Sequence, residues 1–252
     1  MRIKRWTGLL MTLLSANVIS LGSAYAQVAP SIERVSVGES GQQVDSGALR
    51  VSEIRVSFDG DRVLFGSIES LVSGDLNGTG DGYVRIRSSK TTERVTLRAD
   101  GSELMTLGSG LSVADMSSNG RFVVFSSFDD GVVEGDTNGT WDLFVRDVVT
   151  GETELVNLTS DGLQSTNGGS IRTAAVSDDG NIVAFVSGAA DLVPGDTNTR
   201  DDVFVRDLST GEIILLRAPG TPRWWGGDEP DITPDGRYVG YRAYDSLSLI
   251  HI

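Results

Sequence analysis

Short apolar runs recur along the chain, and polar turns rich in Asp, Asn and Gly separate them. The clearest run is Phe122-Val123-Val124-Phe125, which contains no polar residue. A strand with one face in water alternates apolar and polar residues, so an unbroken run predicts a strand that is covered on both faces. Equivalent runs stand at Val63-Leu64-Phe65, at Val183-Ala184-Phe185 and at Tyr238-Val239-Gly240-Tyr241.

A polar turn that contains Asp-Gly or Asn-Gly precedes each of these runs. This dipeptide between two apolar segments favours a β-hairpin, because a two-residue turn of this type needs positive φ angles. We therefore predict one strand before each turn, such as 111–116, and a second strand after it, such as 121–126. The glycines of the four turns are Gly60, Gly120, Gly180 and Gly236.

A second motif, Gly-Asp-x-Asn followed by a further Asp, comes after each of the first three runs. Its copies begin at Gly74, Gly135 and Gly195, so they are 61 and 60 residues apart. Each copy leads into another β-prone run, such as 143–147, and a turn then separates that run from a fourth strand, such as 153–158. Lys90 stands where the later copies of this turn have glycine, which predicts a different turn there.

Four short strands in each repeat, at a fixed spacing of about 60 residues, predict an all-β fold of the β-propeller class. The expected blades cover 49–110, 111–170 and 171–228, and a partial blade covers 229–246. The prediction is thus a partial propeller with about three complete four-stranded blades and a split fourth blade. A two-sheet sandwich is the alternative, although a sandwich does not need an internal repeat of this length.

The segment 32–37 alternates and matches the fourth strand of a repeat, as in Thr92-Glu93-Arg94-Val95-Thr96-Leu97. In propellers the first strand commonly completes the last blade, and we expect the same role here. The fourth blade then lacks its third strand, so the chain is expected to be incomplete. Residues 247–252 resemble a translated sequencing adapter, and we interpret them as a tail that is not part of the natural protein.

The motifs S-x-D-G-R-x-V-x-F, G-D-T-N-G, D-x-F-V-R-D and T-G-E-T together resemble the TolB-like, WD-repeat-like propeller family of exported bacterial proteins. The resemblance covers about residues 31–245. It implies four-stranded blades around a central axis and a role in binding or assembly, without one particular activity. Two departures are Ile86-Arg87 in place of the later Arg-Asp, and Thr199 in place of a motif glycine.

The N-terminal 26 residues have the layout of a secretory signal peptide, with basic residues, an apolar run and Ala24-Tyr25-Ala26. We expect cleavage before Gln27 and a periplasmic or secreted bacterial protein with no membrane span after cleavage. The mature chain has 21 − 3 = 18 basic and 35 acidic residues, a net charge of −17. That charge disfavours nucleic acid and anionic membranes as partners.

The chain has no cysteine and one histidine, His251. Serine–histidine–aspartate triads, cysteine–histidine pairs and ordinary zinc sites are therefore nearly excluded. Neighbouring carboxylates such as Asp129-Asp130 and Asp178-Asp179 are expected to be solvated rather than catalytic. We predict a chain that is not itself an enzyme.

The Asp-x-Asn-x-x-x-Asp loops are the leading candidate site, because they place hard oxygen atoms at the first, third and seventh positions. One interpretation is calcium binding, although the glutamate at position twelve of an EF-hand loop is absent. The other is turn chemistry alone, in which Asp and Asn side chains bond their own backbone. The residues concerned are Asp75, Asn77, Asp81, Asp136, Asn138, Asp142, Asp196, Asn198 and Asp202.

The pair Trp224-Trp225 is the other candidate ligand site, since two indoles beside carboxylates can stack on a sugar or a peptide. The alternative is that these rings pack between blades. We predict an exported binding or scaffold module that recognises a protein, peptide or glycan partner through loops at the blade ends. The alternative function is the propeller domain of a larger secreted hydrolase, either a peptidase or a polysaccharide-active enzyme.

Overall fold

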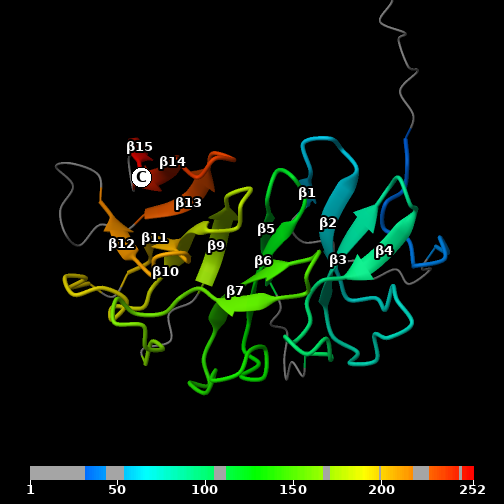
Figure 1. Ribbon diagram of the computed structural model, residues 1–252, viewed down its shortest axis with the longest axis horizontal. Coiled ribbons are helices and arrows are strands. Elements are labelled where there is room, and N and C mark those ends of the chain that lie inside the picture. Colours follow the sequence, from blue (N-terminus) through cyan, green and yellow to red (C-terminus); the bar gives the residue numbers. More distant parts are fainter. Residues whose placement is uncertain are drawn as a thin grey trace, which may run out of the picture. The chain divides into compact units, whose positions relative to one another are not determined.

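The computed structural model describes residues 32–43, 54–104, 112–166, 171–198, 200–217, 227–243 and 246–252 (Figure 1). The chain divides into a short unit, Met1–Glu33, and a large one, Arg34–Ile252. The predicted signal peptide and Trp224-Trp225 lie outside the described residues. In the part of the chain that the structure describes, no helix has the length and apolar composition needed to span a membrane.

The large unit consists of successive antiparallel sheets, each built from strands that are consecutive in the chain. Three sheets have four strands and the last has three, which confirms the predicted all-β, partial-propeller fold. We call the sheets blades 1 to 4. Blade 1 contains β1 (Arg55–Val56), β2 (Arg62–Ser67), β3 (Asp81–Ile86) and β4 (Thr91–Arg94). Blade 2 contains β5 (Ser112–Met116), β6 (Phe122–Ser127), β7 (Asp142–Asp147) and β8 (Thr153–Leu155). Blade 3 contains β9 (Ile171–Val176), β10 (Ile182–Ser187), β11 (Asp202–Asp207) and β12 (Ile213–Leu216), and blade 4 contains β13 (Gly227–Ile232), β14 (Tyr238–Ala243) and β15 (Ser246–His251).

The second strands of blades 1 to 3 are buried on both faces, as their unbroken apolar runs predict, whereas β14 of blade 4 alternates between buried and more exposed residues. In β6, Val123 packs in a cluster with residues of blade 1, whereas Val124 packs in a cluster with residues of blade 3. In β10, Val183 belongs to the cluster shared with blade 2, and Ala184 to the cluster shared with blade 4. Three hydrophobic clusters of the described residues therefore lie between neighbouring sheets, and a smaller cluster of Phe65, Leu71 and Tyr83 lies within blade 1.

The first strands of neighbouring blades lie beside one another, and Asp115 of β5 joins three of them. Its Oδ1 accepts a hydrogen bond from Arg55 Nε of blade 1 at 2.8 Å, and its Oδ2 accepts one from the Val176 amide of blade 3 at 3.3 Å. Burial raises the pKa of Asp115, and the charge of Arg55 opposes that change. One carboxylate thus links blades 1, 2 and 3.

The turns before the second strands are longer than the predicted two-residue type. In the blade 1 turn, Gly60 alone of residues 58–61 has positive φ, at 72°. The Ser57 amide donates to Arg62 O at 2.9 Å, which leaves four residues in the connection. Asp59 closes the loop by accepting the Asp61 amide at 2.9 Å. The Asp side chain therefore supplies a turn of its own, and only the glycine needs the left-handed conformation.

Lys90 does not change its turn, contrary to the prediction. Its φ is 59°, so it adopts the left-handed conformation that Gly151 and Gly211 adopt in the later copies. The surrounding hairpin thus holds a residue other than glycine in the left-handed backbone conformation, which such residues rarely adopt.

Two expectations about the ends of the propeller are wrong. Residues 32–37 form no strand, and only an isolated bridge joins Val37 to Gln43. The fourth blade has a third strand, because β15 pairs with β14 from Tyr238–His251 to Ala243–Ser246. Ser246–His251 thus provides hydrogen-bond partners for the edge of β14.

Each turn glycine from the second blade onward lies under a side chain of the preceding blade. A Cβ atom on Gly180 would lie 2.5 Å from the ring of Phe122, and one on Gly120 would lie 2.5 Å from Arg62 Cδ. Gly236 lies against Ile182 in the same way, at 3.0 Å. These glycines are needed both for their positive φ and for the close approach of the neighbouring blade.

We expect Gly180→Ala to lower the free energy of unfolding by about 3 kcal/mol, because it adds a steric overlap with Phe122 to the cost of a positive φ. Gly60→Ala is the matched control, since Gly60 has a similar φ but its nearest neighbour, Arg87 Nη1, is 3.8 Å away. It should cost about 1 kcal/mol. Urea denaturation of both variants measures the difference, and equal losses would contradict packing of Phe122 on Gly180.

Candidate functional site

The predicted metal loops connect the second and third strands of blades 1 to 3. Their last aspartates, Asp81, Asp142 and Asp202, are the first residues of β3, β7 and β11, and all three are buried. Apolar strands on both sides hold the loops in equivalent positions. The structure therefore brings the nine predicted residues together three at a time, once in each blade.

The middle asparagine of each loop makes the same two hydrogen bonds. In blade 1, Asn77 Oδ1 accepts the Thr79 amide at 2.9 Å, and Asn77 Nδ2 donates to Asp81 Oδ2 at 3.0 Å. Asn138 and Asn198 repeat this arrangement toward Asp142 and Asp202. An amide nitrogen, which cannot ligate calcium, therefore faces the last aspartate, and the asparagine oxygen is used in a turn.

Blade 1 neutralises its loop with its own cation. Arg94 Nη1 lies 3.4 Å from Asp75 Oδ1 and 3.8 Å from Asp81 Oδ2, and it forms an ion pair with Glu103 at 2.7 Å. The Tyr83 hydroxyl donates to Asp75 Oδ2. A buried guanidinium thus stands among the carboxylates, which offsets their mutual repulsion.

In the described residues of blade 2, no cation takes the place of Arg94. Leu155 occupies the position of Arg94, and in the described residues neither Asp136 nor Asp142 forms an ion pair. Burial and the charge of Asp142 together raise the pKa of Asp136 to about 6, although a hydrogen bond from Gln164 opposes the rise. Asp142 is 1% exposed, and its Oδ2 has no hydrogen-bond partner among the described residues.

Blade 3 is intermediate between these two. Arg217 Nη2 lies 3.8 Å from Asp196 Oδ1, whereas Asp196 Oδ2 is buried without a hydrogen-bond partner. Burial raises the pKa of Asp202 to about 6, although a hydrogen bond from Asn198 opposes the rise. The three loops therefore share a turn but differ in how their charge is balanced.

Within the described ranges, no group of three or more carboxylate, histidine or cysteine side chains is arranged to hold a metal ion. Calcium binding stays a prediction for these loops. The blade 2 loop is the best place for it, because Asp136 and Asp142 have unbalanced charge.

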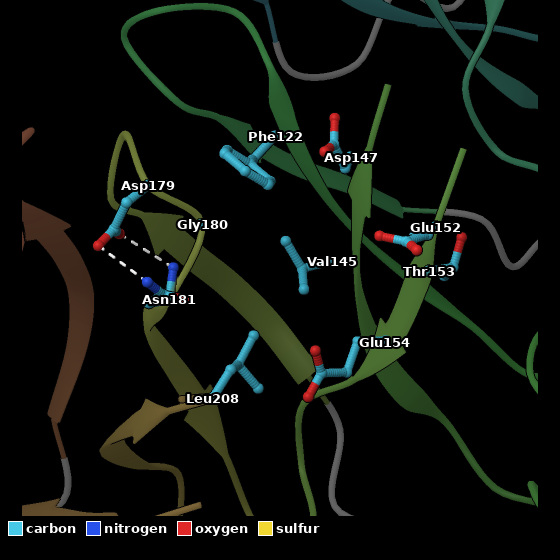
Figure 2. Close-up of a pocket in the computed structure, with 10 residues that line it drawn as sticks. All are labelled: Phe122, Val145, Asp147, Glu152, Thr153, Glu154, Asp179, Gly180, Asn181 and Leu208. Carbon is cyan, nitrogen blue, oxygen red and sulfur yellow. Dashed lines mark hydrogen bonds between the residues drawn. The ribbon is translucent and has the colours of Figure 1, made fainter. Parts of the chain in front are cut away.

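A crevice of about 390 Å³ opens between blades 2 and 3 (Figure 2). Its floor consists of Phe122, Val145 and Leu208. Glu152 and Glu154 stand on one side, where β8 and the turn before it form the wall. Asp179 stands on the other side, in the turn before β10. A concave apolar floor with a few polar groups around it is the usual form of a ligand site.

Asp147, at the rim of the same crevice, already has a cationic partner. Arg121 donates from Nε to both carboxylate oxygens at 3.1 Å and from Nη2 to Oδ2 at 2.7 Å. These bonds lower the pKa of Asp147 to about 2. The rim thus combines one neutralised carboxylate with carboxylates that remain open to solvent.

This crevice was not predicted from the sequence, and two of the acid pairs differ from the prediction that they are solvated. Asp129 is not solvated but buried, and it pairs with Arg98 at 3.0 Å. Asp178 accepts the Ser118 hydroxyl of the preceding blade at 2.8 Å. Superposing the repeats in the sequence does not single out the crevice, since Glu93 of blade 1 matches Glu154 and only blade 3 differs there, with Ile214.

Comparison with protein-family models finds no match, and comparison with curated proteins finds none either. Solved structures similar to this chain include the putative TolB of Agrobacterium tumefaciens, with 14% identity and a TM-score of 0.51 over 84% of this chain and 66% of that one. Dipeptidyl peptidase 4 of Porphyromonas gingivalis has 14% identity and a TM-score of 0.48 over 87% of this chain and 36% of that one. The propeller domain of Cps50 (Swd1) from Myceliophteria thermophila has 12% identity and a TM-score of 0.45 over 81% and 55%.

This chain therefore spans less than two thirds of each of these three structures. The identities are low, so the likeness to TolB establishes the propeller fold and no activity.

We expect Asp136→Asn to stabilise the protein at pH 7.5 by about 2 kcal/mol and to have little effect at pH 4. The folded pKa of about 6 lies above the ordinary value of 3.8, so the folded state binds the proton more tightly. The destabilisation from Asp136 therefore appears as the pH rises from about 4 to about 6. Urea denaturation at several pH values measures it, and a constant difference between variant and wild type would contradict the assignment.

Calcium binding in blade 2 predicts that EDTA lowers the melting temperature at pH 7.5 and that added Ca²⁺ restores it. The effect should disappear in Asp136→Asn and weaken at pH 5, where protonation competes with the metal. Asp75→Asn is the matched control, because Arg94 already neutralises that loop. An unchanged melting temperature after both treatments of the wild type would refute the prediction.

Proposed function

We propose that this chain is a recognition module without catalysis of its own, which binds a protein partner through loops at the blade ends. Its fold supplies a rigid frame, and binding residues on propellers and similar scaffolds lie on the loops that such a frame positions. Peptides and glycans are the alternative ligand classes, and Trp224-Trp225 would contribute to either.

The observation that carries the proposal is that one loop position differs from blade to blade while the strands repeat. Directly after the second strand stand Ile68, Phe128 and Gly188. Phe128 is 50% exposed and meets Trp141 edge to face, with ring centroids 6.2 Å apart. Neighbouring aromatic rings at a surface are typical of protein interfaces.

The second candidate is the propeller domain of a larger hydrolase. It is supported by composition, since a chain with one histidine and no cysteine would leave nucleophilic catalysis to another domain. Measuring hydrolysis of peptides and polysaccharides by the complete protein and by this chain separates the candidates, because activity in the complete protein alone supports the hydrolase.

Export to the periplasm or the medium belongs to the same proposal. The basic N-terminus and the apolar run before Ala24-Tyr25-Ala26 support it. A mature N-terminus other than Gln27, or retention of the chain in the cytoplasm, would refute it.

We expect a Phe128→Ala, Trp141→Ala double variant to retain at least tenfold less of the partner than the wild type. Both chains are immobilised and exposed to envelope extract of bacteria that carry the gene, and the bound proteins are quantified by mass spectrometry. Ile68→Ala, at the equivalent position of blade 1, is the control. Equal retention by folded variant and wild type would exclude this aromatic pair from the interface.

A further inference from the structure

The crevice between blades 2 and 3 combines an apolar floor with an acidic rim (Figure 2). Phe122 and Leu208 are partly buried and pack against the core shared by the two blades, so the floor is fixed by the fold. Glu152 is exposed and accepts the Thr150 hydroxyl at 3.3 Å. Asp179 accepts the Asn181 amide at 3.0 Å and thereby holds the opposite wall.

Of the rim carboxylates, Glu154 has the fewest hydrogen bonds and ion pairs to offset its negative charge. It lies on β8 opposite Val145, and no hydrogen bond or ion pair engages its carboxylate in the described residues. The charge of Arg206 acts on it, but Arg206 donates its Nη1 hydrogen bonds to Leu158 O and Thr159 O and also interacts with Asp207. The rim therefore keeps negative charge next to an apolar surface.

The equivalent place between blades 1 and 2 keeps one of the acids, with Glu93 at the position of Glu154, but not the other two. Thr91 stands there in place of Glu152, and Asn119 in place of Asp179. The place of Phe122 is taken by Arg62, whose aliphatic stem lies across Gly120. The methylene stem of an arginine thus packs on the turn glycine of the next blade, as the ring of Phe122 packs on Gly180.

We propose that the crevice between blades 2 and 3 receives a lysine or arginine side chain of the partner protein. The methylene stem would pack on Phe122 and Leu208, and the cation would meet Glu154 and the rim acids. This inference rests on the proposed function, because the side chain belongs to the recognised protein. Apolar burial and charge complementarity then act on one residue of the partner.

The test uses Nα-acetyl-lysine methylamide as the probe and two-dimensional ¹H–¹⁵N NMR of the mature chain as the readout. We expect saturable shifts of the Glu154, Asn181 and Leu208 amides with a Kd of about 1–10 mM. Glu154→Gln should weaken binding at least threefold. Glu93→Gln, at the same strand position of blade 1, should leave it unchanged.

Nα-acetyl-norleucine methylamide is the uncharged comparison. Equal affinity for both probes, shifts elsewhere on the chain, or equal weakening by both Gln variants would overturn the proposal. Absence of shifts would overturn it as well. The partner-capture experiment with the Phe128 and Trp141 variant is independent of these results, so failure of the probe with successful capture rejects the crevice and not the module.

Discussion

The burial of one strand between two neighbouring sheets is the constraint on which this structure depends. β6 and β10 have apolar side chains on both faces, so each needs a sheet on either side of its own. The two largest hydrophobic clusters of the described residues accordingly lie between blades. Hydrogen bonds also cross between blades, since Asp115 joins three blades and Asp178 joins two. Stability is therefore a property of neighbouring pairs, as in other repeat proteins.

The repeat pattern was sufficient to predict the blades, because apolar runs and turn glycines recur at the same spacing. It did not predict the longer connection around Gly60, since Asp59 closes a turn through its side chain rather than through its own φ. It also failed at Lys90, where the hairpin overrides the residue's preference. Strand β15 was missed because no motif marks it. Pairing across the edge of β14 depends on backbone groups that every sequence has.

The sequence also predicted one candidate site and not the other. The Asp-x-Asn loops could be located from spacing, but their charge balance depends on Arg94 and Arg217, which come from distant parts of each repeat. The crevice could not be located, because its floor and its two walls come from different blades. Sequence reasoning finds chemistry within a repeat more readily than chemistry between repeats.

The contact between each turn glycine and the preceding blade has a consequence for how such chains grow. The receiving residue is glycine at Gly120, Gly180 and Gly236, whereas the residue received is Arg62, Phe122 or Ile182. The glycine is thus the same at each contact, whereas the side chain that packs on it varies. A gene duplication that inserts one more repeat would place compatible surfaces on both of its borders. Propellers of this type can therefore gain blades without changes to the existing contacts between blades.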